Sequence, residues 1–303
     1  MRVLIWDFDG VIVDTVQECY ALMLRTIEKE KAGITKEAGL TKFPPIPFGD
    51  FEAYRSKSVN AADFFANYLL HRAGEELSED NLEKATNEHR AFLRRMDVVF
   101  YEERERMMNE DEAAYFETLK VYPGIPDVLE SLSRKGVRHA IMSARDSHSI
   151  RQILDHFSLL GHFEFIIGHE VEKGDRHVKG KQISLLKAYF SEKYANDPGG
   201  EKCAGDEKLI AGEKRYASEK HATWEKQAAK ENHRLAGNGD MGPGDLRLPA
   251  NIEYFFIDDI PFNLAKVGTG VVLLFAGWGY GKLKKDYVKA MEIPRPEELL
   301  GIL

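Results

Sequence analysis

Five short apolar runs recur along the chain, and sequence typical of helices separates them. They occupy residues 3–6, 137–142, 163–168, 253–257 and 270–275. Short runs of this kind are typical of strands that are buried on both faces of a sheet. Strands that alternate with helices favour a parallel sheet with helices on both sides. The pattern therefore predicts an α/β fold built on a three-layer parallel sheet.

Polar residues follow three of these runs, at the point where each predicted strand ends. Asp7 and Asp9 follow the first run, Ser143 follows the second, and Asp258–Asp259 follow the fourth. Residues two apart in an extended chain point the same way, so Asp7 and Asp9 can face one cleft. In open parallel sheets, the active site lies outside the carboxyl ends of the strands. We therefore expect these side chains to meet there; the alternative is that Asp-x-Asp-Gly only forms a turn.

Carboxylates gathered at one point need a cation between them, because they otherwise repel each other. Oxygen ligands suit Mg²⁺, which also binds substrate phosphate. The hydroxyl of Ser143 and the ammonium of Lys179 are suitable donors to a phosphate group. Asp7 could then act as a nucleophile that forms an aspartyl phosphate. Asp9 could protonate the leaving oxygen and later take a proton from water.

Residues 16–118 have a different sequence pattern, with apolar residues at helical spacing and no evident strand. Helices are predicted over 61–72, 79–95 and 98–119, after a proline-rich loop at 43–50. We therefore expect an all-α domain inserted into the α/β fold.

The remaining segments, 1–15 and 119–303, are expected to form the core domain. A loop with several lysines is predicted to lead into a helix over 182–193. Within this core, residues 195–250 contain no valine and no phenylalanine, so they can bury little apolar surface. We expect a hydrophilic insertion there, with a charged helix around Trp224.

Composition limits the partners and the compartment. The 303-residue chain has a net charge of −8, which argues against nucleic acid or an anionic membrane as a main partner. Its two cysteines, Cys19 and Cys203, are far apart and have no metal-ligand spacing, which fits a reducing compartment. The first apolar run is too short for a signal peptide. A cytoplasmic protein is expected, and its oligomeric state is not predicted.

Taken together, these motifs resemble those of the haloacid dehalogenase (HAD) superfamily, in particular the branch of phosphoglycolate phosphatases and β-phosphoglucomutases. Two short motifs that do not lie at the polar strand ends, one before the second strand and one after the fifth, are also similar to that branch. The residues that carry the resemblance are Asp7-x-Asp9-Gly10, Ser143, Lys179, Asp258-Asp259-x-x-x-Asn263, Tyr122-Pro123-Gly124 and Trp278-Gly279-Tyr280-Gly281.

The resemblance implies a HAD-like Rossmannoid core with a helical cap at residues 16–118. It implies that Asp7 is the nucleophile and a metal ligand, and that Asp9 is the general acid/base with its carbonyl on the metal. Asp259 would ligate Mg²⁺ directly and Asp258 would support the water shell of the metal. The phosphate would bind to Ser143, Ala144, Gly10 and Lys179. Asn263 stands where many members have an aspartate, so its role is open.

Two assignments remain open between alternatives. Lys179 has the better distance to the following helix, but Lys181 and Lys173 are alternatives for the phosphate-binding lysine. Arg55 is a candidate for selecting a substrate with an anionic group, and its alternative is an ordinary surface arginine.

The resemblance implies a Mg²⁺-dependent phosphatase that acts on a small phosphorylated metabolite through an aspartyl phosphate. The first alternative is a phosphomutase that returns the phosphoryl group to a sugar phosphate. The second is a non-catalytic binding protein on the same core.

Overall fold

The structure is a computed structural model, and it describes most of the chain. The chain divides into two compact units, Met1–Phe190 with Ile252–Leu303, and Ser191–Asn251. The helix predicted around Trp224 lies outside the described residues, so the account below concerns the first unit. The described residues are 1–38, 44–55, 58, 60–168, 178–194, 252–283 and 288–303.

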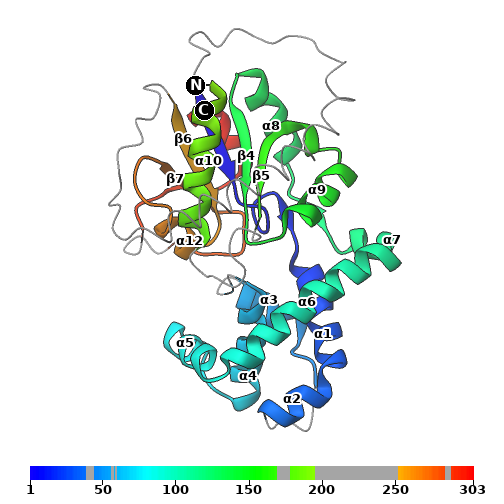
Figure 1. Cartoon of the computed structure of the whole chain (residues 1–303). Helices are drawn as coiled ribbons and strands as arrows, with labels where there is room; N and C mark the ends of the chain where they lie inside the picture. Colours follow the sequence, from blue (N-terminus) through cyan, green and yellow to red (C-terminus); the bar gives the residue numbers. More distant parts are fainter. Residues whose placement is uncertain (39–43, 56–57, 59, 169–177, 195–251, 284–287) are drawn as a thin grey trace. The chain divides into compact units, whose positions relative to one another are not determined.

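A six-stranded sheet forms the centre of this unit, with the strand order β5-β4-β1-β6-β7-β8 (Figure 1). Every neighbouring pair is parallel, which confirms the predicted α/β class. The sequence predicted five of these strands. The edge strand β8 was missed because it has only three residues, two of them exposed. The strands are β1 Arg2–Trp6, β4 Arg138–Met142, β5 Phe163–Ile167, β6 Glu253–Asp258, β7 Val272–Ala276 and β8 Met291–Ile293.

Strand β1 lies in the middle of the sheet because its side chains from Val3 to Trp6 are all fully buried. It pairs with β4 on one side and β6 on the other, and Trp6 is in register with both Ile141 and Ile257. The carboxyl ends of these three strands are therefore level. They are the three strands that the predicted polar residues follow.

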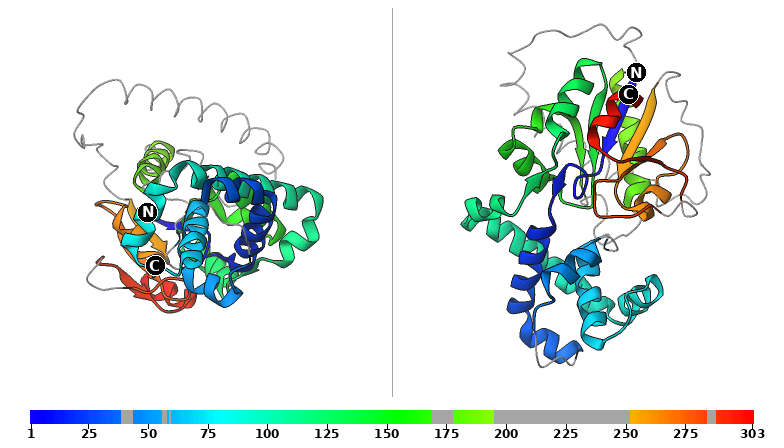
Figure 2. Two further views of the ribbon diagram at one scale, coloured as in Figure 1. Left: turned by 90° about the horizontal axis from the view of Figure 1, so that it is seen from below. Right: turned by 180° about the vertical axis from the view of Figure 1, so that it is seen from behind.

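Helices cover both faces of this sheet. Helix α10 crosses one face in Figure 1, and α13 lies on the opposite face in the reverse view of Figure 2. The chain ends meet at one end of the sheet, where Arg2 Nη1 donates to the Leu303 carbonyl at 2.8 Å. The helices of this part are α8 Ile125–Arg134, α9 Ser147–His156, α10 Val178–Tyr194, α12 Pro261–Ala265 and α13 Leu299–Ile302.

Helix α10 begins earlier than predicted, at Val178 rather than at residue 182. Lys179 and Lys181 therefore belong to its first turn and not to a loop. Gly180 costs helix stability by about 1 kcal/mol relative to alanine. The buried contacts of Lys179 and Gln182 offset this cost.

All described secondary structure between residues 16 and 118 is helical, as predicted. Three boundaries were wrong. The predicted helix over 79–95 is broken at His89, which ends α5 and begins α6. The predicted helix over 98–119 is not separate from its predecessor, because α6 runs without a break from Arg90 to Glu110, and the break falls instead at Asp111, before α7. The predicted proline-rich loop is shorter, because α3 already begins at Phe48. The helices are α1 Val16–Lys29, α2 Lys31–Ala38, α3 Phe48–Arg55, α4 Ala61–Ala73, α5 Glu79–Glu88, α6 Arg90–Glu110 and α7 Glu112–Glu117.

A small antiparallel pair of strands joins the two ends of this helical segment. Strands β2 (Val13–Asp14) and β3 (Lys120–Val121) pair directly, with Val13 opposite Val121. They were not predicted, because two residues carry no periodic signal. The helical segment thus leaves and re-enters the sheet-containing part at adjacent points. Its assignment as a separate cap domain stays a prediction, since both parts fall in one compact unit.

No helix in the described part of the chain is both long enough and apolar enough to cross a lipid bilayer.

Candidate active site

Three buried carboxylates converge at the carboxyl ends of β1 and β6. One oxygen from each of Asp7, Asp258 and Asp259 lies within 4.8 Å of the other two. The parallel pairing of the strands continues past Trp6, because the Asp7 amide donates to the Ile257 carbonyl at 2.9 Å. We call these three residues the acidic cluster. The predicted convergence of the strand ends is therefore present.

Lys179 is the lysine that reaches the acidic cluster. Its ammonium donates to Asp7 Oδ1 at 2.7 Å and to the Met142 carbonyl, and lies 3.7 Å from Asp258 Oδ2. Its side chain is only 2% exposed, whereas Lys181 is exposed. The third alternative, Lys173, lies outside the described residues.

The pKa values of all three carboxyl groups in the acidic cluster are raised, because burial outweighs the positive charge around them. Burial raises the pKa of Asp7, although Lys179 opposes this rise. Burial, together with the charge of Asp7, holds the pKa of Asp258 well above its usual value. Burial likewise raises the pKa of Asp259 to about 7, against the opposing charge of Arg55. Burial thus disfavours the charged form of all three carboxylates, and a further cation in the cluster would favour it.

The donor set of the acidic cluster fits a hard divalent cation. Among the described residues, Asp258 Oδ2 and Asp259 Oδ1 are buried without a hydrogen-bond partner. A buried carboxylate oxygen without a hydrogen bond is costly, and a bound metal ion would remove that cost. An all-oxygen set of this charge suits Mg²⁺. Asp7, Asp258 and Asp259 are therefore the side chains that would hold the ion.

Neighbouring groups fix the orientation of the two aspartates after β6. Asp258 Oδ1 accepts from the Ile260 amide at 2.8 Å and from Asn263 Nδ2 at 3.2 Å. Asp259 Oδ2 accepts from the Tyr280 amide at 2.7 Å. Asn263, whose role was open, thus holds Asp258 in place. The role of Tyr280 was not predicted.

Glycines allow the surrounding backbone to approach Asp259 closely. Gly10 has a positive φ of +85°, and a Cβ there would lie 2.6 Å from Asp259 Oδ2. A Cβ at Gly279 would lie 2.3 Å from Asp259 Cβ, and a Cβ at Gly281 would lie 1.8 Å from the Asp259 carbonyl oxygen. The turn after Asp9 and the Gly-rich loop after β7 can therefore enclose the site only without side chains at these positions.

Ser143 lies at the end of β4, beside β1, and is almost fully buried. Its Oγ accepts from the Arg145 amide at 3.1 Å. Gln182 Nε2 donates to the carbonyls of Ser143 and Gly168, both at 2.8 Å. Ala144 lies next in this loop, and its carbonyl accepts from the Tyr101 hydroxyl at 3.3 Å. Helix α10 thus supplies both Lys179, at the acidic cluster, and Gln182, which holds the Ser143 loop.

Asp9 is bound differently from the acidic cluster. Its carboxylate forms an ion pair with Arg145, with Nη2 at 2.8 Å and Nε at 3.1 Å from Oδ1. Burial acts to raise the pKa of Asp9, but the charge of Arg145 outweighs it, so the pKa lies below its usual value.

Arg145 belongs to a buried network that the sequence did not predict. Its Nη2 donates to Glu18 Oε2 at 2.6 Å, and Arg104 Nε donates to Glu18 Oε1 at 2.8 Å. The Tyr115 hydroxyl donates to the same Oε1 at 2.8 Å. We call Asp9, Glu18, Arg104, Tyr115 and Arg145 the ionic cluster.

A signal for the ionic cluster is nevertheless present in the sequence. Glu18 lies on the face of α1 that also buries Val16, Cys19 and Leu22. A carboxylate on an apolar helix face requires a buried counter-charge. Periodicity reveals that requirement, but it does not reveal that the partner is Arg145, distant in sequence.

Arg55 is buried, so its alternative as an ordinary surface arginine is wrong. It ends α3 with 6% of its area exposed, and its guanidinium lies 4.7 Å from the ring centroid of Tyr280. Its Nη1 donates to the Ser58 carbonyl at 3.0 Å, and its Nε is buried without a hydrogen-bond partner among the described residues. Burial acts to lower the pKa of Arg55, but the surrounding charges, those of Asp9 and Asp259 among them, outweigh it and raise the pKa. Arg55 therefore brings positive charge from the helical segment to both aspartates.

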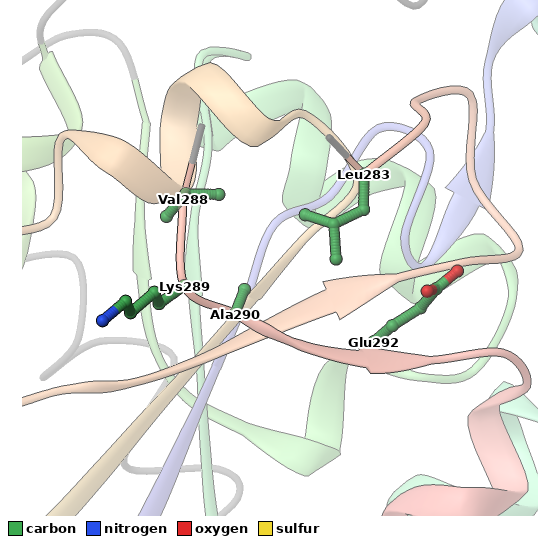
Figure 3. A pocket seen from close by; sticks show the side chains of 5 residues that line it. All are labelled: Leu283, Val288, Lys289, Ala290 and Glu292. Carbon is green, nitrogen blue, oxygen red and sulfur yellow. The ribbon is translucent and has the colours of Figure 1, made fainter. Parts of the chain in front are cut away.

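A separate hollow is lined by Leu283, Val288, Lys289, Ala290 and Glu292, beside β8 (Figure 3). It shares no residue with the acidic cluster or the ionic cluster. We therefore place the candidate active site at the two clusters.

Solved structures share this fold. A predicted phosphoglycolate phosphatase from Haemophilus somnus 129PT matches with a TM-score of 0.54 at 12% identity, over 99% of this chain and 96% of that chain. Protein tyrosine kinase A (PtkA) from Mycobacterium tuberculosis matches with a TM-score of 0.53 at 17% identity, again over 99% of this chain and 96% of the other. At these identities the likeness concerns the fold alone.

Sequence comparisons connect the chain to a family. A curated phosphoglycolate phosphatase from Aquifex aeolicus (strain VF5) is 25% identical over 168 residues, which cover 55% of this chain and 61% of the relative. The match thus spans less than two thirds of that relative. The family model for haloacid dehalogenase-like hydrolases matches residues 1–203, about two thirds of the chain. With the sheet order and the acidic cluster described above, this match shows that the chain belongs to the haloacid dehalogenase-like hydrolase family.

Proposed function

We propose that this protein is a Mg²⁺-dependent phosphatase that hydrolyses a small phosphorylated metabolite through an aspartyl phosphate on Asp7. The observation that carries the proposal is the acidic cluster, where Asp7 accepts from Lys179 and lies beside Asp258 and Asp259, each of which has a buried oxygen without a hydrogen-bond partner among the described residues. Family membership and the name of the Aquifex relative support the same reaction class.

In the first step, the Asp7 carboxylate attacks phosphorus and the ester P–O bond breaks. Because Arg145 keeps the pKa of free Asp9 low, Asp9 must gain a proton when the anionic substrate binds, and it passes this proton to the leaving oxygen. In the second step, the Asp9 carboxylate takes a proton from water as that water attacks phosphorus. The acyl phosphate P–O bond then breaks, which releases inorganic phosphate and restores Asp7.

Other groups in the site bind charge. The Lys179 ammonium balances Asp7, and with Ser143, Ala144 and Gly10 it would bind the phosphoryl oxygens. Asp7, Asp258 and Asp259, with the Asp9 carbonyl, would hold Mg²⁺, which neutralises charge on the phosphoryl group when it is bound. Apart from Lys179 of α10, these assignments use only residues of the two clusters and their adjoining loops.

We further propose that the helical segment 16–118 is a cap that selects the substrate through Arg55. The Nε of its guanidinium has no hydrogen-bond partner among the described residues, and the guanidinium lies over the ring of Tyr280, the residue whose backbone amide donates to Asp259. A substrate with a second anionic group, such as the carboxylate of phosphoglycolate, would bind there.

The test measures turnover of p-nitrophenyl phosphate and of a panel of phosphorylated metabolites, with and without Mg²⁺. We expect Asp7→Asn to lower kcat by about 10³-fold or more, because the nucleophile is lost. The exposed Asp155 of α9 offers a matched control, and Asp155→Asn should retain full activity. Unchanged turnover in Asp7→Asn would overturn the proposal. Rapid release of phosphate from the aspartyl phosphate would argue against a phosphomutase.

A further inference from the structure

Every N–H of Arg145 is used inside the ionic cluster. Its Nε contacts Asp9, its Nη1 donates to Glu18 Oε1 at 2.9 Å and to the Tyr115 hydroxyl at 3.2 Å, and its Nη2 contacts Asp9 and Glu18. A guanidinium has five N–H donors. With all of them engaged and a side chain only 1% exposed, Arg145 has no donor left for a substrate.

Arg145 holds Asp9 mainly by one oxygen. Asp9 Oδ1 accepts from both Nη2 at 2.8 Å and Nε at 3.1 Å, whereas Oδ2 receives only the shared contact to Nε at 3.2 Å. The Asp9 side chain is 16% exposed, more than the other charged members of the ionic cluster, which are 0% to 6% exposed. Oδ2 is therefore the oxygen with the capacity to exchange a proton.

Arg145 is itself oriented from the helical segment. Glu18 of α1 lies between Arg145 and Arg104 of α6, and Tyr115 of α7 donates to Glu18 while it accepts from Arg145. Two carboxylates thus face two guanidiniums, and the charges balance. A buried network whose donors and acceptors are satisfied keeps its members in one orientation.

We infer that Arg145 is the positioning residue of Asp9, and that the helical segment orients Arg145 through Glu18. The inference rests on the proposed function, because it takes Asp9 as the general acid/base. The helical segment thereby contributes to proton transfer as well as to substrate choice. The consequence is specific: a misplaced Asp9 slows the release of leaving groups that need a proton.

The experiment compares two esters whose leaving groups differ in basicity, 2,4-dinitrophenyl phosphate and phenyl phosphate. Dinitrophenolate leaves without a proton, whereas phenolate needs one. General acid catalysis contributes about 10² to 10⁴-fold. We expect Arg145→Gln to lower kcat for phenyl phosphate by about 10²-fold, and for the dinitrophenyl ester by less than about 5-fold. Equal losses on both esters would overturn the role of Arg145.

A second variant guards against a loss of folding. Arg145→Lys keeps the charge, but one ammonium cannot hold two carboxylates in a fixed fork. It should show the same preference for the dinitrophenyl ester, with a smaller loss. The matched control is Glu103→Gln, because Glu103 is a buried α6 carboxylate that pairs with Lys29 and Arg106 outside the ionic cluster. Glu103→Gln should lower kcat for both esters by the same factor or leave both unchanged.

A double-mutant cycle separates this inference from the proposed function. If Arg145 acts through Asp9, the double mutant Asp9→Asn/Arg145→Gln should have the same kcat for phenyl phosphate as Asp9→Asn alone. Additive losses would overturn the inference while leaving the phosphatase proposal intact. Absence of turnover by the unmodified chain on either ester would overturn both.

Discussion

The acidic cluster and the ionic cluster are neighbouring buried sites with opposite charge balance. In the acidic cluster, the ammonium of Lys179 contacts two of the three carboxylates, Asp7 and Asp258. In the ionic cluster, the two carboxylates face two guanidiniums that form ion pairs with them. The pKa values follow this difference. Burial raises the pKa of Asp258 and Asp259, while arginines hold the pKa of Asp9 and Glu18 below the usual value in spite of burial.

The comparison shows how burial of the same chemical group can serve two purposes. A buried carboxylate without enough counter-charge raises the free energy of the folded chain, and that cost is recovered when a cation binds. A buried carboxylate with full counter-charge instead holds its partners in position. We therefore expect the acidic cluster to bind a metal and the ionic cluster to position Asp9.

The largest expected effect comes from removing one member of the ionic cluster. Glu18→Ala leaves Arg104 and Arg145 facing each other without their shared carboxylate. The free energy of unfolding should fall by about 3 to 5 kcal/mol, as expected when a buried ion pair loses one partner. Urea denaturation of the metal-free protein measures this change.

The matched variant in the acidic cluster is Asp258→Asn. It keeps an acceptor for the Ile260 amide and removes a repelling charge, so it should lower the free energy of unfolding by less than about 1 kcal/mol. Equal losses in Glu18→Ala and Asp258→Asn would contradict the contrast between the two clusters.

The next effect concerns Arg55, the cation that faces both clusters. Arg55→Gln should lower kcat/KM for phosphoglycolate about 10-fold more than for p-nitrophenyl phosphate, a difference of about 1.4 kcal/mol. The reason is that only phosphoglycolate has a second anionic group. Steady-state kinetics with both esters measures the difference. Arg94→Gln, at an exposed position of α6, is the control; equal losses on both esters would exclude Arg55 as the selecting residue.

The last effect is the pH dependence of the metal-free fold. The folded-state pKa of Asp259 is raised from 3.8 to about 7. A carboxyl group with a raised pKa stabilises the fold fully below its unfolded pKa, and this contribution is lost as the pH rises through the folded pKa. Relative to Asp259→Asn, the wild-type melting temperature should therefore fall by several degrees, on the order of 10 °C, between pH 4 and pH 7.

Scanning calorimetry with a chelator present measures this fall, and Mg²⁺ should reverse it. A melting-temperature difference that stays constant with pH would show that Asp259 is ionised without a metal. Asp9 and Glu18 act in the opposite sense, because their lowered pKa makes their contribution disappear as the pH falls. Subtracting the Asp259→Asn curve removes that shared contribution.

The two clusters also differ in how far the sequence predicted them. Asp7, Asp258 and Asp259 follow apolar runs, and parallel strands end at one edge, so their convergence follows from local pattern and general topology. Lys179 was favoured as the phosphate-binding lysine because of its distance to the following helix, but the alternatives Lys181 and Lys173 lie only a few positions away in the sequence. Its contact with Asp7 decides between Lys179 and Lys181.

The amino-acid sequence by itself determined the fold class, five of the six strands and the residues of the acidic cluster, because strand periodicity and strand-end chemistry are local. Only the tertiary structure decided that Arg145 lies between Asp9 and Glu18 and that Arg55 is buried. The ion pairs of Arg145 join residues more than 100 positions apart. No local periodicity encodes such a pairing, since it exists only after the helices and the sheet have packed together.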